Sequence, residues 1–222
     1  MQPQHSNVIS PLEAVLVVVA TFFLSIFVGA IILLTLGDAV TLVLGELIIL
    51  LVPLGFMAFK RVSIRSYVPM EVKPKFILLG LAFGVVLVLI DIVVSNVLTA
   101  IFGVSQAVEE SNTLLTGLSG SAWGLAAVVA SLALAGVCEE FAFRGFLQNA
   151  LNRRFSFLPS VLISAAAFGI FHFDPQGVYI LSAFISGLVL GYVYHRWNSY
   201  VVSALAHSTL NLIVLALLLL GL

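Results

Sequence analysis

Charged side chains are scarce in this sequence: 9% of its 222 residues are Asp, Glu, Lys or Arg, whereas 62% are hydrophobic. A soluble globular domain has about 25% charged and about 45–50% apolar residues. The composition therefore excludes an ordinary soluble domain and predicts an all-α, polytopic transmembrane helix bundle, with residues 1–222 forming one integral-membrane domain. The formal net charge is −1, so nucleic acid is not an expected partner, whereas membrane lipid is.

The sequence also has only one cysteine, no recognisable signal peptide and no visible internal repeat. Cys138 is the single cysteine, so no disulfide can form within the chain. Met1–Ser10 has neither the basic region nor the small-residue cleavage site of a signal peptide. We therefore expect Pro11–Leu36 to be retained as the first span. No internal repeat is visible, although many membrane carriers are built from repeats.

Long apolar segments dominate what is present. A membrane-spanning helix needs about 20 apolar residues. The chain is predicted to form about seven spans, of which the fifth is short: Pro11–Leu36, Val40–Phe59, Phe76–Phe102, Ala122–Leu151, Pro159–His172, Val178–His195 and Tyr200–Leu222. The polar, acidic connection Gly103–Gly120 is expected to be a solvated outer loop, with a lid or re-entrant segment as the alternative.

The basic residues follow the alternation of these spans. Apart from Arg144, which lies inside the fourth span, they occupy alternate connections: Lys60, Arg61, Arg65, Lys73, Lys75, Arg153, Arg154 and Arg196. Cytoplasmic loops of membrane proteins are enriched in Lys and Arg. This pattern predicts a cytoplasmic N-terminus and an outer C-terminus. We expect the membrane to be the plasma membrane of a microbe.

Several side chains that can carry chemistry lie inside the apolar segments. They are Glu139, Glu140, Arg144, His172, His207 and Asn211. Ionisable groups at membrane depth are costly, so they usually face a protein interior or a wet cavity and mark function. Glu46 and Asp91 also lie within predicted spans, and for them we leave open whether they line a cavity or pair between helices.

Helical spacing separates the roles of the two adjacent glutamates. Glu140 and Arg144 are four residues apart, so they can pair on one helix face. Glu139 is turned by about 100° from Glu140, which leaves it free to meet His172 and a water molecule. Counting about 1.5 Å per residue from the turn between spans four and five puts Glu139 and His172 at similar depth, nearer the cytoplasmic side.

This set of residues suits hydrolysis. A desolvated Glu139 can act as a general base, with His172 holding the same water. His207 and Asn211, again four residues apart, can donate to a developing oxyanion. Alternatively, Glu139, His172 and His207 form a three-ligand set for a catalytic zinc, although no HExxH motif is present.

The residues resemble the CAAX protease and bacteriocin-processing (CPBP/Abi) family, which includes the type II Ras-converting CAAX endopeptidases. Its EExxxR, FxxxH and HxxxN motifs are matched in order by Glu139, Glu140 and Arg144, by Phe168 and His172, and by His207 and Asn211. The resemblance covers about residues 120–215, which we regard as the catalytic motif region.

The resemblance implies an intramembrane endopeptidase. It assigns water activation to Glu139 and His172 and oxyanion stabilisation to His207 and Asn211, with Glu140, Arg144 and Phe168 in support. Both a zinc-dependent and a metal-independent glutamate mechanism are described for such enzymes. Expected substrates are prenylated CaaX-type tails or other membrane-associated peptides, cleaved near the cytoplasmic side. The alternative is a non-enzymatic membrane protein, either a bacteriocin immunity or binding factor or a proton-coupled carrier.

Overall fold

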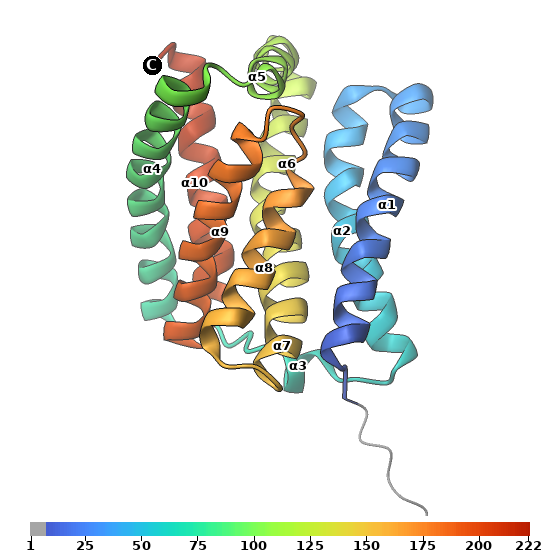
Figure 1. Cartoon of the computed structure of the whole chain (residues 1–222). Coiled ribbons are helices and arrows are strands. Elements are labelled where there is room, and N and C mark those ends of the chain that lie inside the picture. Colours follow the sequence, from blue (N-terminus) through green and yellow to red (C-terminus); the bar gives the residue numbers. More distant parts are fainter. Residues whose placement is uncertain (1–7) are drawn as a thin grey trace, which may run out of the picture.

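The structure, a computed structural model, describes residues 8–222, and within that range its regular structure is entirely helical (Figure 1). The elements are α1 (Pro11–Leu36), α2 (Asp38–Phe59), α3 (Ile64–Tyr67), α4 (Pro74–Phe102), α5 (Gln106–Ser119), α6 (Ala122–Glu140), the π-helix η1 (Phe141–Gln148), α7 (Asn149–Asn152), α8 (Phe157–Phe171), α9 (Val178–Trp197) and α10 (Tyr200–Leu220). The predicted absence of a signal peptide concerns Met1–Ser10, of which residues 1–7 lie outside the described range.

The number of spans agrees with the hydropathy of the sequence. Among the described residues, six helical stretches are long and apolar enough to cross a membrane, namely α1, α2, α4, α6 continued through α7, α9 and α10. Helix α8 is apolar but has only 15 residues. These findings confirm the predicted all-α bundle of about seven spans, as expected for an integral, multi-pass membrane protein.

Local chemistry sets where the helices begin and end. Pro11 occupies the first turn of α1, and Ser10 and Glu13 form a reciprocal capping box that satisfies two exposed amides. Gly37, with φ +81°, separates α1 from α2. Lys60 at the end of α2 pairs with Glu13 at 2.8 Å, which joins the two helices at the end of the bundle where α1 begins.

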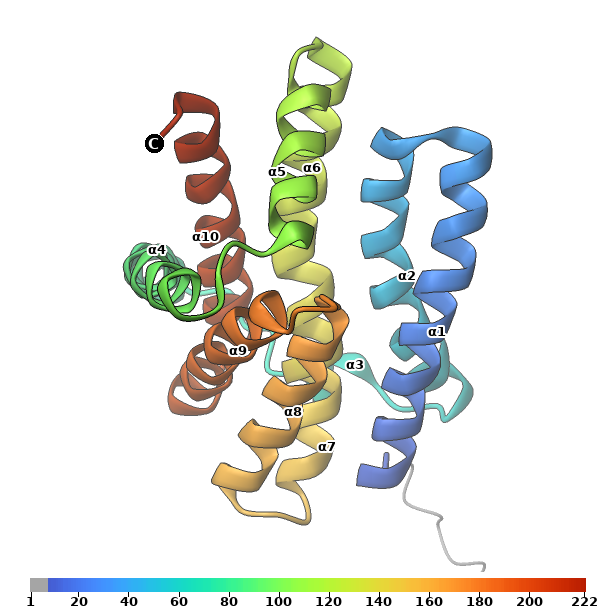
Figure 2. The same cartoon turned by 45° about the horizontal axis from the view of Figure 1, so that its top comes forward.

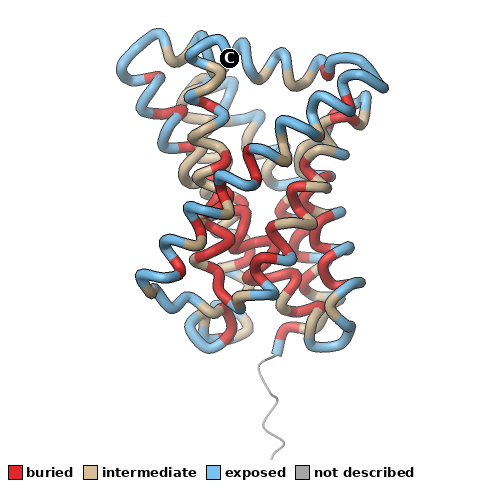
Figure 3. The backbone as a smooth tube through the Cα atoms, turned by 90° about the vertical axis from the view of Figure 1, so that its left-hand side faces the viewer, coloured by how far each residue is buried: buried red, intermediate tan, exposed pale blue. Residues whose placement is uncertain are grey.

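The connections that carry the basic residues all lie at that same end of the bundle (Figure 1). The opposite end holds the α1–α2 connection, α5 and the end of α10. Buried segments are concentrated in the half nearer the start of α1, whereas the helices are more exposed in the other half (Figure 3). Which end faces the cytoplasm stays a prediction.

Most of the connection Gly103–Gly120 is the helix α5, which has no buried residue, packs along α6 (Figure 2) and lines a cavity. Its N-cap residue Ser105 donates a hydrogen bond to Asp174 at 3.1 Å, and the amides of Gln176 and Tyr179 donate to the same carboxylate at 2.9 Å. Burial alone would raise the pKa of Asp174, but these hydrogen bonds hold it below its ordinary value. The start of α5 is therefore fastened to the α8–α9 connection.

Glycines allow α10 to pack closely against its neighbours. A Cβ atom at Gly84 of α4 would lie 2.9 Å from the carbonyl oxygen of Ala206. A Cβ atom at Gly136 of α6 would lie 2.7 Å from the carbonyl oxygen of Ala204 and would overlap the backbone of Ser208. In membranes, small residues of this kind let helices approach closely enough to gain packing energy.

Gly136→Ala tests this packing. Overfilling a tight contact costs about 1–3 kcal/mol, so we expect a lower melting temperature in detergent and, because Glu139 lies less than one turn away, altered function. Gly29→Ala is the matched control, since a Cβ atom there meets nothing within 4 Å. Equal melting temperatures for the two variants would contradict this account of the α6–α10 contact.

Candidate active site

The candidate site is built around η1, where the fourth span changes from α-helical to π-helical turns. π-Helical segments are rare and occur frequently at functional sites. Two backbone carbonyls of η1 accept bonds from other helices: Phe143 from the hydroxyl of Ser164 at 2.8 Å, and Phe146 from the hydroxyl of Tyr67 at 3.3 Å. The apolar pattern of the span did not indicate this change.

Arg144 is fully buried at the centre of η1. Its Nη1 lies 2.5 Å from Oε1 of Glu140, which agrees with the predicted pair. Its Nη2 donates to the carbonyl oxygen of Gly187 at 2.9 Å, and the guanidinium lies 4.5 Å from the ring centroid of Phe168. Through the contacts with Gly187 and Phe168, Arg144 joins η1 to α9 and α8. Loss of Glu140 would leave the buried charge of Arg144 uncompensated.

Gln148 extends the same contact by one turn and was missed in the sequence. Its Nε2 donates to the carbonyl oxygen of Gly191 at 3.0 Å. A Cβ atom at Gly191 would lie 2.9 Å from Oε1 of Gln148, so a larger residue there would displace this amide. The sequence does contain a sign of this contact: Gln148 follows Arg144 by four residues, and Gly191 follows Gly187 by the same spacing.

His207 lies between the two glutamates. Its Nδ1 is 3.2 Å from Oε1 of Glu140, and its Nε2 is 4.0 Å from Oε2 of Glu139. A carboxylate paired with a guanidinium can only accept hydrogen bonds, so we assign the donated proton to Nδ1 of His207. The tertiary structure thus gives Glu140 a second partner that helical spacing did not reveal.

Glu139 is buried, and its Oε2 has no hydrogen-bond partner. Buried polar atoms are rarely left in this state, and the imidazole that lies 4.0 Å from Oε2 is that of His207 rather than the predicted His172. Glu46 of α2 lies within electrostatic range of Glu139 and also has a buried, unpartnered oxygen. The carboxyl groups of Glu46 and Glu139 are therefore close enough to interact.

His172 is the C-cap residue of α8, directly after Phe171. Its Nδ1 is 2.9 Å from the carbonyl oxygen of Phe168, and because a carbonyl can only accept, Nδ1 carries the proton and Nε2 is left as an acceptor. The ring packs edge to face against Tyr179, at 5.0 Å between centroids. Within the described residues, no hydrogen bond or ion pair joins His172 to Glu139.

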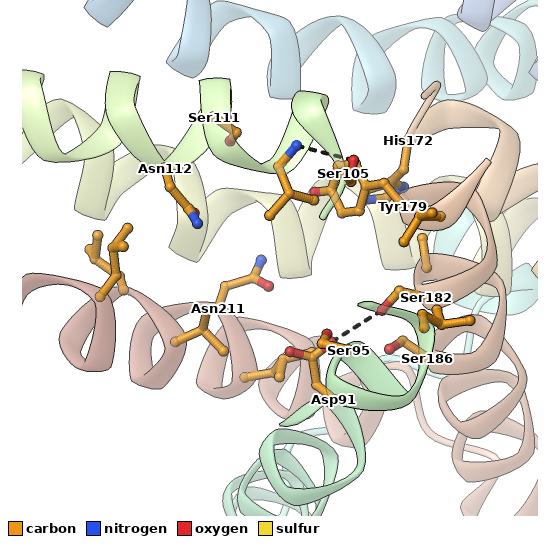
Figure 4. A pocket seen from close by; sticks show the side chains of 18 of the residues that line it. Asp91, Ser95, Ser105, Ser111, Asn112, His172, Tyr179, Ser182, Ser186 and Asn211 are labelled. Carbon is orange, nitrogen blue, oxygen red and sulfur yellow. Dashed lines mark hydrogen bonds between the residues drawn. The ribbon is translucent and has the colours of Figure 1, made fainter. Parts of the chain in front are cut away.

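A cavity of about 280 Å³ brings the remaining predicted residues together (Figure 4). Phe168, His172, His207 and Asn211 all lie in its wall, together with parts of α4, α5, α6 and α9. Nδ2 of Asn211 donates to the carbonyl oxygen of Leu132 at 3.3 Å, which anchors the amide and leaves its second N–H available. The cavity extends from the level of His207 toward α5, away from the end with the basic residues.

The three candidate zinc ligands do not converge in this conformation. Within the described part of the chain, no three His, Cys, Asp or Glu side chains are close enough to hold one metal ion. His207 Nε2 and Glu139 Oε2 face each other, but His172 makes no contact with either that would complete a site with three ligands. The donor arrangement therefore does not fit a zinc ion.

No curated protein and no solved structure matched. Residues 121–213 match the family model described as type II CAAX prenyl endopeptidase Rce1-like. The match spans η1, the end of α8 and the His207–Asn211 pair, which agrees with the three motifs. This segment of the chain is therefore similar to the Rce1-like type II CAAX prenyl endopeptidases.

Proposed function

We propose that this protein is an intramembrane endopeptidase that hydrolyses a peptide bond of a membrane-associated substrate. The observation that carries the proposal is the cavity within the helix bundle. His172, His207 and Asn211 lie in its wall, and the unpartnered Oε2 of Glu139 lies 4.0 Å from His207. The family match supports a hydrolase of the protease class.

In the first step, Glu139 takes a proton from water while the water oxygen adds to the peptide carbonyl carbon. The carboxylate suits this role because its buried Oε2 makes no hydrogen bond within the protein. His172 presents the acceptor nitrogen Nε2 and can hold the second hydrogen of the same water, which also accounts for the lack of a direct bond to Glu139. When the C–N bond breaks, the proton passes from Glu139 to the leaving nitrogen.

His207 and Asn211 stabilise the oxyanion formed by that addition. Asn211 has a second amide N–H besides the one bound to Leu132. His207 can donate through Nε2 in the form of the ring that also donates through Nδ1 to Glu140. Donors aimed at developing charge in a site shielded from water contribute strongly to catalysis.

The depth of these groups bears on where cleavage occurs. His207 is seven residues into α10, about 10 Å from its start by helical rise. That is nearer the end with the basic connections, so by the positive-inside rule the bond is cut toward the cytoplasmic half. The substrates are prenylated CaaX-type tails or other membrane-associated peptides, and the protein acts in a microbial plasma membrane with its N-terminus inside.

Glu139→Gln tests the general base. The amide keeps the size of the side chain but cannot take the proton, and loss of a general base costs about 10²–10⁴-fold in rate. We expect turnover of membrane-anchored peptides to fall by that factor while the melting temperature is kept. Glu71→Gln removes an exposed carboxylate and serves as the control.

Two outcomes would count against this assignment. Full turnover in Glu139→Gln would show that another group is the base. If purified wild-type protein cleaved no member of a membrane-anchored peptide library, the alternative of a non-enzymatic membrane protein would be favoured.

Substitution of His207 and Asn211 by Ala separates oxyanion stabilisation from metal binding. Losing one oxyanion donor costs about 10²–10³-fold in turnover, and we expect kcat and kcat/KM to fall together because the interaction forms in the transition state. Zinc content and chelator sensitivity are measured on the same proteins. Stoichiometric zinc that is lost in His207→Ala but kept in Asn211→Ala would refute the oxyanion role of His207.

Arg144→Ala tests the buried pair that supports this site. Removing one partner of a buried ion pair costs about 3–5 kcal/mol, so we expect a clear fall in melting temperature in detergent together with loss of activity. Arg144→Lys keeps the charge and should recover part of the stability. Unchanged stability with complete loss of activity would indicate that Arg144 acts in the chemical step itself.

A further inference from the structure

Asp91 lies on the inward face of α4. Residues spaced three or four apart share one face of a helix, and this face begins with the glycines that pack against α10 and continues through the buried Leu87. One turn further it reaches Asp91, and one turn beyond that Ser95, and both line the cavity. An acidic residue at membrane depth is costly to keep, so its position in the cavity wall calls for a partner.

The partner available within the protein is weak. Oδ1 of Asp91 accepts a hydrogen bond from Ser182 of α9 at 3.4 Å, close to the longest distance at which such a bond forms. Ser95 and Ser186 also line the cavity (Figure 4). These hydroxyl groups can solvate a carboxylate, but they carry no charge that would neutralise it.

The cavity has an acidic character. Among the described residues that line it, Asp91 is the only carboxylate, and there is no Lys or Arg. Arg144 is fully buried and already bound to Glu140 and Gly187. A ligand that brings positive charge or N–H donors into this cavity would therefore meet a carboxyl group that has no Lys or Arg partner in the wall.

We propose that Asp91 is a specificity-determining residue that binds a cationic nitrogen of the substrate, in the same cavity as His207 and Asn211. This rests on the proposed endopeptidase function. The nitrogen is a side-chain ammonium or guanidinium, or a free amino terminus. Hydrogen bonds between charged groups are stronger than those between neutral ones, and they offset part of the cost of removing each charge from water.

The same carboxylate disfavours a particular kind of substrate. A peptide that placed its free carboxyl terminus against Asp91 would bring two like charges together with no basic side chain in the cavity wall to separate them. Like charges at short range in a poorly solvated site repel strongly. The carboxyl end of a CaaX-type tail must therefore lie away from this wall.

Binding to the inactive Glu139→Gln protein in lipid nanodiscs tests the proposal without relying on turnover. Fluorescence anisotropy is measured with labelled short peptides that carry lysine or the isosteric, uncharged norleucine at each position in turn. We expect the lysine peptide to bind about 10-fold more tightly at one position. Acetylating the amino terminus distinguishes a side-chain cation from a terminal amine, because it abolishes the preference only in the second case.

Variants of the same inactive protein assign the effect to Asp91. In the Asp91→Asn variant, the affinity for the lysine peptide should fall to that for the norleucine peptide. With Asp91→Lys, peptides that carry glutamate should bind better than those that carry lysine. Glu109→Gln removes an exposed carboxylate of α5 outside the cavity lining and should keep the preference.

The results separate this inference from the proposed function. Equal affinity for charged and uncharged peptides in the parent, with free and with acetylated amino termini, would overturn the role of Asp91. An equal loss for both peptides in Asp91→Asn would do the same. If charge-dependent binding persists but wild-type protein cleaves none of these peptides, the site stands and the endopeptidase function fails.

Discussion

The buried ion pair between Arg144 and Glu140 is the interaction on which the rest of the site depends. Both side chains are fully buried, and neither charge can reach water. Their mutual attraction and the further hydrogen bonds to Gly187 and His207 are what make this burial tolerable. Because Gly187 lies on α9 and His207 on α10, these hydrogen bonds also fix the positions of the two helices against η1.

The arrangement orients the imidazole of His207. Glu140 accepts from Nδ1, so Nε2 is turned toward Glu139. A ring oriented in this way by a carboxylate is a recurring feature of sites in which histidine donates or accepts a proton. Close packing of α10 against Gly136 then keeps the distance between His207 and the adjacent glutamates short.

The two halves of the bundle serve different purposes. The half around η1 is densely buried (Figure 3), which excludes water and strengthens the electrostatic interactions of the charged groups. The other half encloses a cavity with serine, asparagine and aspartate side chains in its wall and α5 fastened along one side. In the proposed endopeptidase, this cavity would hold a substrate segment, with the bond to be cut at the boundary between the halves.

The sequence by itself determined the features that depend on neighbouring residues. Hydropathy and the alternation of basic connections predicted the helical spans, and four-residue spacing predicted the pair of Glu140 with Arg144 and the shared cavity face of His207 and Asn211. These properties need only the geometry of a single helix, which every residue in it obeys.

Only the tertiary structure decided which distant side chains meet. Glu140 contacts His207 across 67 residues and Arg144 contacts Gly187 across 43, whereas the predicted meeting of Glu139 with His172 is not seen. Local periodicity likewise could not predict the π-helical turns, the helical nature of α5 or the place of Asp91 in the cavity wall. The physical reason is that helix rotation and approach are set by packing between segments far apart in the chain, such as the contacts of Gly136 with α10.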